Sequence, residues 1–235
     1  YYNNTGDGLH HFIDPEDGKE YLYTNLEPYS AHRFLPCFDQ PDLKAVLELE
    51  VQAPKEWKII SNNPKEKIIQ GKEIKTVKFK PTPRISTYLF HLSAGEYVEF
   101  KDIFRSNKKK IPLKIFCRKS MVKSLNKKQI FQITKQGLDF YSKFFDFPYP
   151  FEKYDQIFAP EFNAGAMENV GAITFSEHLI YRHKPTRTEL SRQAGVILHE
   201  MVHMWFGDLV TMKWWDDLWL NESFADYLSY LGLTR

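Results

Sequence analysis

Two histidines stand four positions apart in this chain, and a glutamate follows nineteen positions after the second. They are His199 and His203, with Glu200 between them and Glu222 beyond. Residues four apart lie one above the other on a single face of an α-helix, so both imidazole rings can bind one metal ion. A second helix carrying Glu222 can supply a third ligand. Three protein ligands leave one position of a tetrahedral zinc ion open for water, which is typical of catalytic zinc sites.

This spacing also predicts a reaction. Zinc lowers the pKa of its bound water to about 7, and Glu200 can take the proton of that water and later pass it to a leaving amine. We therefore predict hydrolysis of an amide bond, with one zinc ion per chain. The alternative is a surface helix that carries two histidines at this spacing by chance. Residues 188–206, however, have apolar side chains at a helical period, as in a largely buried helix, where polar groups need partners.

Four separated stretches of the sequence resemble the M1 (gluzincin) family of zinc aminopeptidases. The first surrounds the two histidines and the distant glutamate, at residues 199–208 and 214–222. The second is GAMEN at residues 165–169, the third contains FPYP and KYD within residues 147–155, and the fourth contains EP and RFLPCFDQP within residues 27–41. Along the chain, the four stretches occur in the same order as in the family. Together they extend from residue 27 to residue 222, so the resemblance covers nearly the whole chain.

The resemblance implies an enzyme that releases single residues from peptides with a free N-terminus. A bound peptide N-terminus is a cation, and carboxylates fixed beside it give charge-assisted contacts. By resemblance, Glu168 and Glu27 hold this α-amine, and the substrate backbone lies along the extended segment that contains Glu168. The substrate-binding residues that we expect are Glu27, Gly165, Ala166, Met167, Glu168 and Asn169.

Two alternatives remain open. One branch of the same family, similar to leukotriene A4 hydrolase, hydrolyses a fatty-acid epoxide at a comparable zinc site. That branch usually has glycine in place of Ala166 and glutamine in place of Glu27. The other alternative is a non-catalytic scaffold or binding protein that kept the fold, although the expected ligands and base are all intact. The leading prediction is a zinc aminopeptidase.

Asp226 is a candidate partner for one of the zinc ligands. It lies one helical turn after Glu222, and histidines that bind zinc commonly donate their other ring N–H to a carboxylate. The alternative for Asp226 is a solvated position on the helix surface.

The pattern of apolar residues predicts an α+β fold. Short apolar or alternating stretches predict strands in the first half, and the period lengthens to that of a helix beyond residue 120. The resemblance implies a β-rich (saddle or sandwich) domain at residues 1–118 and the first part of a thermolysin-like zinc metallopeptidase domain at residues 119–235. The expected strands lie within residues 44–52, 74–79, 88–92, 111–116, 155–158 and 172–175, and the expected helices cover residues 130–145, before Pro148, and 188–206, before Gly207.

Both ends of the sequence are expected to be internal to a longer protein. The chain begins with Tyr1 rather than methionine, and residues 227–233 have the composition of the interior of an apolar helix. By resemblance, further strands precede the chain, a long helical portion comes after it, and a tyrosine that stabilises the oxyanion lies beyond Arg235. Losing one oxyanion donor typically costs about 10²- to 10³-fold in rate, so we expect this segment alone to be severely impaired or unstable.

Composition argues against several other classes of protein. Of the 235 residues, 43% are hydrophobic, which is ample for a core, and the net charge of +2 gives no reason to expect a nucleic-acid partner. No apolar run approaches the roughly 18 residues that a membrane span requires. Cys37 and Cys117 suit neither a metal site nor a disulfide framework, so a cytoplasmic location is the default expectation. The preferred N-terminal residue and the oligomeric state stay open.

Overall fold

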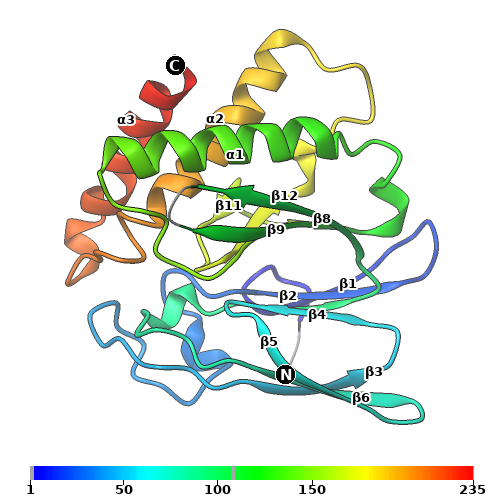
Figure 1. Cartoon of the computed structure of the whole chain (residues 1–235). Coiled ribbons are helices and arrows are strands. Elements are labelled where there is room, and N and C mark those ends of the chain that lie inside the picture. The colour runs from blue at the N-terminus through cyan, green and yellow to red at the C-terminus, as the bar shows by residue number, and fades with distance from the viewer. Residues whose placement is uncertain (1–2, 107–108, 235) are drawn as a thin grey trace.

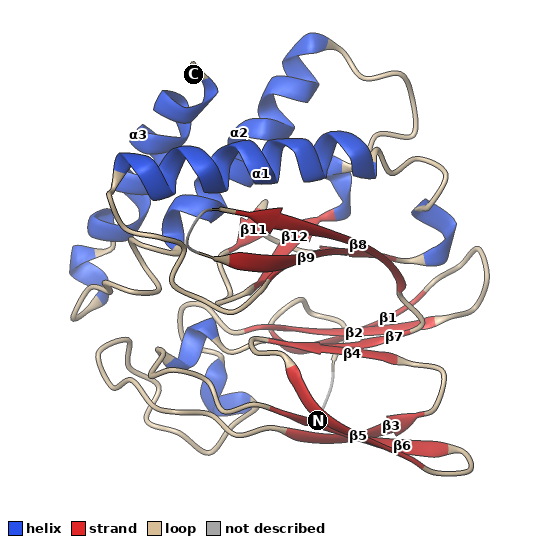
Figure 2. Cartoon of the chain, in the orientation of Figure 1, coloured by secondary structure: helices blue, strands red, loops and turns tan. Residues whose placement is uncertain are grey.

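The computed structural model of the chain describes residues 3–106 and 109–234. Three sheets lie one below another, and the helices α1 (Lys127–Phe144), α2 (Arg187–His203) and α3 (Trp219–Leu233) cover the outer face of one of them (Figures 1 and 2). We call residues 3–95 the N-terminal region, and residues 98–106 and 109–234 the C-terminal region. The α+β class expected from the sequence is confirmed.

The N-terminal region consists of two antiparallel sheets. One has the strand order β1 (Gly8–Ile13), β2 (Glu20–Asn25), β7 (Leu92–Gly95), β4 (Lys58–Ser61), and the other has the order β3 (Glu50–Pro54), β6 (Ile74–Phe79), β5 (Lys65–Gln70). A shared apolar core that includes Leu26, Ile59, Val77, Phe79 and Phe90 lies between these sheets. This region is therefore a small β-sandwich, as expected.

The C-terminal region is organised around a five-stranded mixed sheet. Its order is β11 (Ala166–Met167), β12 (Ala172–Ser176), β10 (Tyr154–Ala159), β9 (Lys110–Cys117), β8 (Val98–Arg105), and β10 runs parallel to both of its neighbours. Every residue of β10 and β12 is buried. Such continuous burial requires cover on both faces, which the helices give on one side and the N-terminal region on the other (Figure 2).

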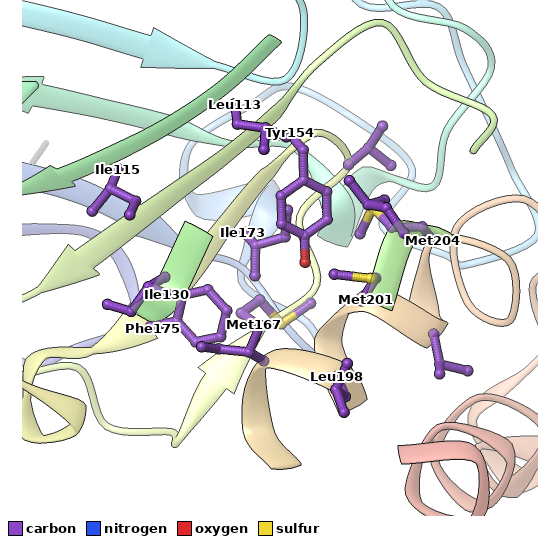
Figure 3. Close-up of a cluster of buried hydrophobic side chains, with 14 of the residues drawn as sticks. Leu113, Ile115, Ile130, Tyr154, Met167, Ile173, Phe175, Leu198, Met201 and Met204 are labelled. Atoms are coloured by element: carbon purple, nitrogen blue, oxygen red, sulfur yellow. The ribbon is translucent and has the colours of Figure 1, made fainter. Parts of the chain in front are cut away.

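The two helices nearest the sheet have clear local signals. Asn126 caps α1, and Thr186 with Glu189 forms a capping box at the start of α2. The helices approach closely at Gly137, where a β-carbon would lie 2.7 Å from the side chains of Leu198 and Met201. Figure 3 shows these two side chains in the core that joins helix and sheet, with Met167, Ile173 and Phe175. Among the described residues, no helix is both long enough and apolar enough to cross a membrane.

Three expected elements differ from the structure. Residues 44–49 make an isolated bridge, Ala45 to Ile85, and two further backbone hydrogen bonds but no continuous ladder, because the facing segment contains Pro81 and Pro83, which have no N–H to donate. Within residues 88–92, Tyr88 and Leu89 belong to a buried 3₁₀ helix, η2 (Thr87–Leu89), and the strand starts only at Leu92.

The third difference concerns the histidine-bearing helix. It ends at His203, three residues earlier than the apolar pattern predicts. After His203 the backbone tightens, with the N–H groups of Met204 and Trp205 donating to carbonyls three residues back. Gly207 then adopts φ +134°, in the region that favours glycine, and reverses the chain.

The sheet arrangement bears on the expected domain boundary. Strands β8 and β9 precede residue 118, yet β9 pairs with β10 and both belong to the sheet of the C-terminal region. Buried residues of the N-terminal region, among them Tyr23, Ile85 and Tyr88, also pack into the core of the C-terminal region. A boundary between residues 118 and 119 stays a prediction, while the strand pairing groups residues 98–117 with the C-terminal region.

Candidate active site

The structure brings together the three side chains expected to bind zinc. The Nε2 atoms of His199 and His203 lie 3.1 Å apart, and the Glu222 carboxylate oxygens lie 3.3 Å from His199 Nε2 and 3.6 Å from His203 Nε2. Ligands arranged tetrahedrally at about 2.0–2.1 Å from zinc are about 3.3–3.4 Å from one another. The two ring nitrogens and the Glu222 carboxylate, whose Oε2 faces His199 and whose Oε1 faces His203, therefore have the spacing that tetrahedral zinc ligands require.

A backbone carbonyl group orients the imidazole ring of His203. Its Nδ1 donates to the carbonyl oxygen of Phe206 at 3.0 Å, so Nε2 is left to face the metal position. Gly207 makes room for this contact, because a β-carbon there would lie 3.1 Å from His203 Nδ1. Phe206 could not be identified in this role from its residue type, since any residue can supply a backbone carbonyl.

Three further carboxylates surround the ligands, and with Glu222 they form what we call the acid cluster: Glu27, Glu168, Glu200 and Glu222. Ligand atoms of Glu168, Glu200 and His203 all lie within 4.8 Å of one another, and the same holds for Glu27, Glu168 and Glu222. Glu200 is on α2, Glu168 follows β11, and Glu27 follows β2 in the N-terminal region. Side chains from both regions thus converge on one place.

Burial and mutual repulsion shift the proton equilibria of this cluster. Burial and the carboxylates of Glu168 and Glu222 raise the pKa of Glu27 to about 8. Burial and Glu222 raise the pKa of Glu168 to about 7, and burial with the neighbouring carboxylates raises the pKa of Glu200 well above its usual range. So many acids gathered in one buried place form a site suited to binding positive charge, both a metal ion and an ammonium group.

Substitution of Glu27 by glutamine is expected to flatten the pH dependence of stability in the metal-free protein. The ordinary pKa of a glutamate side chain is 4.5, and the pKa values of Glu27 and Glu168 in the folded protein are about 8 and about 7. The folded state therefore holds more protons than the unfolded chain within this window. The free energy of unfolding falls as pH rises from about 4.5 through 8, by at most about 1.4 kcal/mol per pH unit for each proton. Glutamine at position 27 removes one of the titrating groups.

Chemical denaturation in the presence of a chelator, at several pH values from about 5 to 8, measures this slope. Glu66→Gln, an exposed change on β5, serves as the control and should keep the parent's slope. Equal slopes for Glu27→Gln and the parent would contradict the assignment of a raised pKa to Glu27.

A cavity of about 520 Å³ opens beside His199 and Glu200. Gly165 and Ala166 line it on one side, and His199 and Glu200 line it on another. A peptide in this cavity would lie alongside the predicted base and one metal ligand. The volume fits several amino-acid residues of a bound chain.

The five residues of the GAMEN stretch are placed differently from one another. Gly165 and Ala166 reach the cavity, whereas the Met167 side chain points into the core (Figure 3). Glu168 belongs to the acid cluster. Asn169 is fully buried, its Oδ1 accepts from Thr174 Oγ1 at 3.1 Å, and its Nδ2 lies 3.4 and 3.5 Å from the carbonyl oxygens of Phe90 and Leu89. The side chains of Met167 and Asn169 therefore cannot touch a peptide, and the position of Asn169 instead suits it to hold the segment.

Among the described residues, the carboxylate of Asp226 makes no hydrogen bond to any of the predicted zinc ligands. Asp226 is exposed and lines the cavity, and no hydrogen bond of its carboxylate occurs within the described part of the chain. A different residue of α3 makes a hydrogen bond to the N-terminal region. Asn221, which precedes Glu222, donates through Nδ2 to the hydroxyl of Tyr88 at 3.2 Å. Tyr88 lies in η2 of the N-terminal region, and no motif of the sequence points to it.

Comparisons with known proteins agree with the family resemblance of the sequence. The family model for the peptidase M1 N-terminal domain matches residues 2–89, and the model for the peptidase family M1 domain matches residues 130–235. Aminopeptidase N of Streptomyces lividans is 49% identical over 226 residues, which are 96% of this chain and 26% of that protein.

Two archaeal relatives are also similar. Probable aminopeptidase 1 of Sulfurisphaera tokodaii is 44% identical over 94% of this chain, and leucyl aminopeptidase of Saccharolobus solfataricus is 41% identical over 91% of it. The chain covers 28% and 27% of these two proteins. It therefore spans about a quarter of the length of the curated relatives that it matches.

Proposed function

The chain belongs to peptidase family M1, and on that premise we propose that the protein containing it is a zinc-dependent aminopeptidase. The proposal rests on one observation above all: three metal-ligating side chains, with contacts of 3.1–3.6 Å between them, lie directly beside a pair of carboxylates, Glu27 and Glu168, that need positive charge to balance them. One group of residues suits a divalent cation, and the other suits a substrate ammonium group.

The ligands His199, His203 and Glu222 fit zinc by residue type and by spacing. A zinc ion bound there supplies a polarised water and a Lewis acid for the scissile carbonyl. Glu200 is the group positioned to accept a proton from the attacking water and to return it to the leaving amine, because it lines the cavity and lies within 4.8 Å of His203. Its raised pKa suits a group that must both take and release a proton.

Glu27 and Glu168 determine where the peptide is cut. An α-ammonium group held between these two carboxylates places the first peptide bond next to the metal ligands, since Glu222 lies within 4.8 Å of both carboxylates. A residue with a blocked amine cannot make these contacts. The remainder of the peptide would extend past Ala166 into the cavity beside α2.

We expect the full-length protein to hydrolyse a leucine arylamide and to lose this activity when the α-amine of the substrate is acetylated. Leaving a buried charge without its partner costs about 2–5 kcal/mol, so the expected loss in kcat/KM is about 30-fold to 10³-fold or more. Glu168→Gln should reduce kcat/KM for the free amine and narrow the difference between free and blocked substrates. Steady-state kinetics on both substrates, with zinc added and with a chelator, provide the measurement.

The outcomes separate the candidate functions. Equal cleavage of free and blocked substrates would contradict an aminopeptidase and favour an endopeptidase. No cleavage of either substrate would shift the proposal toward the epoxide-hydrolysing branch or a scaffold. Ala166 and Glu27 argue against the epoxide branch, because glycine and glutamine are usual there.

A further inference from the structure

The turn that carries Glu168 is held by a residue of the N-terminal region, Asn62. This side chain is 1% exposed and lies just after β4. Its Nδ2 donates to the carbonyl oxygen of Leu89 at 2.8 Å and to that of Val170 at 3.0 Å, while its Oδ1 accepts from the N–H of His91 at 2.8 Å. Both amide hydrogens and the amide oxygen are therefore engaged, and one bond crosses to the Glu168 turn.

The backbones of the two regions also touch at this place. Gly171 has φ +64°, and a β-carbon there would lie 2.7 Å from the carbonyl oxygen of Asn62 and 3.3 Å from that of Lys153. Any larger residue at position 171 would push the turn away from Asn62. The close approach is independent of the side-chain hydrogen bonds and shows the same pairing of residue 62 with the turn at residues 168–171.

The other side of the turn is fixed by an uncharged network. Thr174 Oγ1 donates to Asn169 Oδ1 and lies 3.3 Å from Nδ1 of His91, whose Nε2 lies 2.8 Å from Ser93 Oγ. Burial lowers the pKa of His91 to about 3, so this ring stays neutral in the working range of pH. A charged donor adds to this support, because Lys153 Nζ, which is paired with Asp155, donates to the carbonyl oxygen of Gly171 at 2.7 Å.

Glu168 depends on this support. It is 3% exposed, and its Oε1 has no hydrogen-bond partner among the described residues. The carboxylate has a hydrogen bond to the backbone of Glu168 itself, so the backbone of residues 168–171 governs where it lies. A shift of about 1 Å in a group that binds substrate can cost about 10²-fold in rate.

We propose that Asn62 is a positioning residue: through Val170 it places the Glu168 carboxylate where the substrate α-amine binds. This inference rests on the proposed function, because it assumes that Glu168 binds the amine. Asn62 touches neither the substrate nor the metal position. Its effect should appear in KM, since an interaction weakened equally in the bound substrate and in the transition state raises KM with little change in kcat.

The test uses Asn62→Asp in the full-length protein. Aspartate keeps the shape of the side chain but replaces its N–H donor with an acceptor that faces two carbonyl oxygens. We expect KM for a leucine arylamide to rise about 10- to 100-fold, the preference for free over acetylated substrate to shrink, and the bound zinc per chain to stay the same. Asn62→Ala is the second variant, because it removes the bonds without introducing a charge and so tests the same point if the aspartate variant does not fold.

Ser61→Ala is the matched control. Ser61 is the neighbouring residue, also buried, and its Oγ donates to the carbonyl oxygen of His91 at 2.7 Å rather than to the turn. It should lower the melting temperature without changing KM or the discrimination against blocked amines. If the Asn62 variants behave like Ser61→Ala while Glu168→Gln raises KM, the positioning role is overturned and the proposed function stands. If Glu168→Gln itself leaves KM and discrimination unchanged, the proposed function fails instead.

Discussion

Replacing Glu200 by glutamine is expected to lower kcat by about 10²- to 10⁴-fold while zinc remains bound. General acid–base catalysis by one positioned group contributes about this much. Glutamine fills the same volume on α2 but cannot accept and return a proton. Because Glu200 is 5% exposed and lines the cavity beside the ligands, a base from bulk solvent has poor access to the same position. The measurement is kcat for a leucine arylamide together with the zinc content of the purified variant.

Glu189→Gln controls for the loss of a negative charge on the same helix. Glu189 is the last residue of the capping box, and glutamine also satisfies that motif, so kcat should stay near the parental value. A Glu200→Gln variant that retains more than a tenth of the parental kcat would contradict Glu200 as the base.

The second large effect is expected at the third ligand. Glu222→Ala should lower zinc affinity at least about 10²-fold, because even residues that only hydrogen-bond to a zinc ligand commonly contribute about 10- to 100-fold to affinity. Activity should fall in proportion to the zinc content. The parent should also gain thermal stability when zinc is added, since a ligand that binds only the folded state contributes about 2.7 kcal/mol at about 100 times its Kd. The variant should gain much less. Metal analysis and melting curves with and without zinc test both expectations.

Asp216→Asn removes a charge from an exposed position in the short helix that precedes α3 and should leave zinc binding intact. Parental zinc affinity in Glu222→Ala would exclude Glu222 as a ligand. Restoration of activity by a large excess of zinc would support a loss of affinity rather than a loss of fold.

Local spacing was enough to predict part of the site. His199 and His203 are four apart on a helix whose start has a capping box, so their shared face follows from helical geometry alone. The approach of Glu27 and Glu168 required the family resemblance, because these residues lie 141 positions apart in the sequence and meet only when the two regions pack. The inward direction of Asn169 could not be predicted. Its partners include backbone carbonyls at the end of η2, which leave no signature in the sequence.

In the fold, too, local elements could be predicted from the sequence, and elements that depend on distant partners could not. The strand at residues 74–79 and the two long helices follow from periodicity, which reports burial of one face. Residues 88–92 were misassigned because a buried 3₁₀ turn is as apolar as a buried strand, and its polar backbone is satisfied by a distant side chain, Asn62. Residues 44–49 have the alternation of a strand, but pairing depends on the partner segment, and there Pro81 and Pro83 limit it.

The origin of Glu27 has a consequence for how such an enzyme can diversify. The metal ligands and Glu200 all come from α2 and α3, whereas Glu27, Tyr88 and Asn62 come from the N-terminal region. Under the proposed function, the residues for bond cleavage therefore lie in the C-terminal region, whereas recognition of the peptide N-terminus is divided between Glu168 in that region and Glu27 in the N-terminal region. Recombination that exchanged the N-terminal region between relatives would replace the contribution of Glu27 to the amine site, while Glu168, Glu200 and the metal ligands passed unchanged to the descendant.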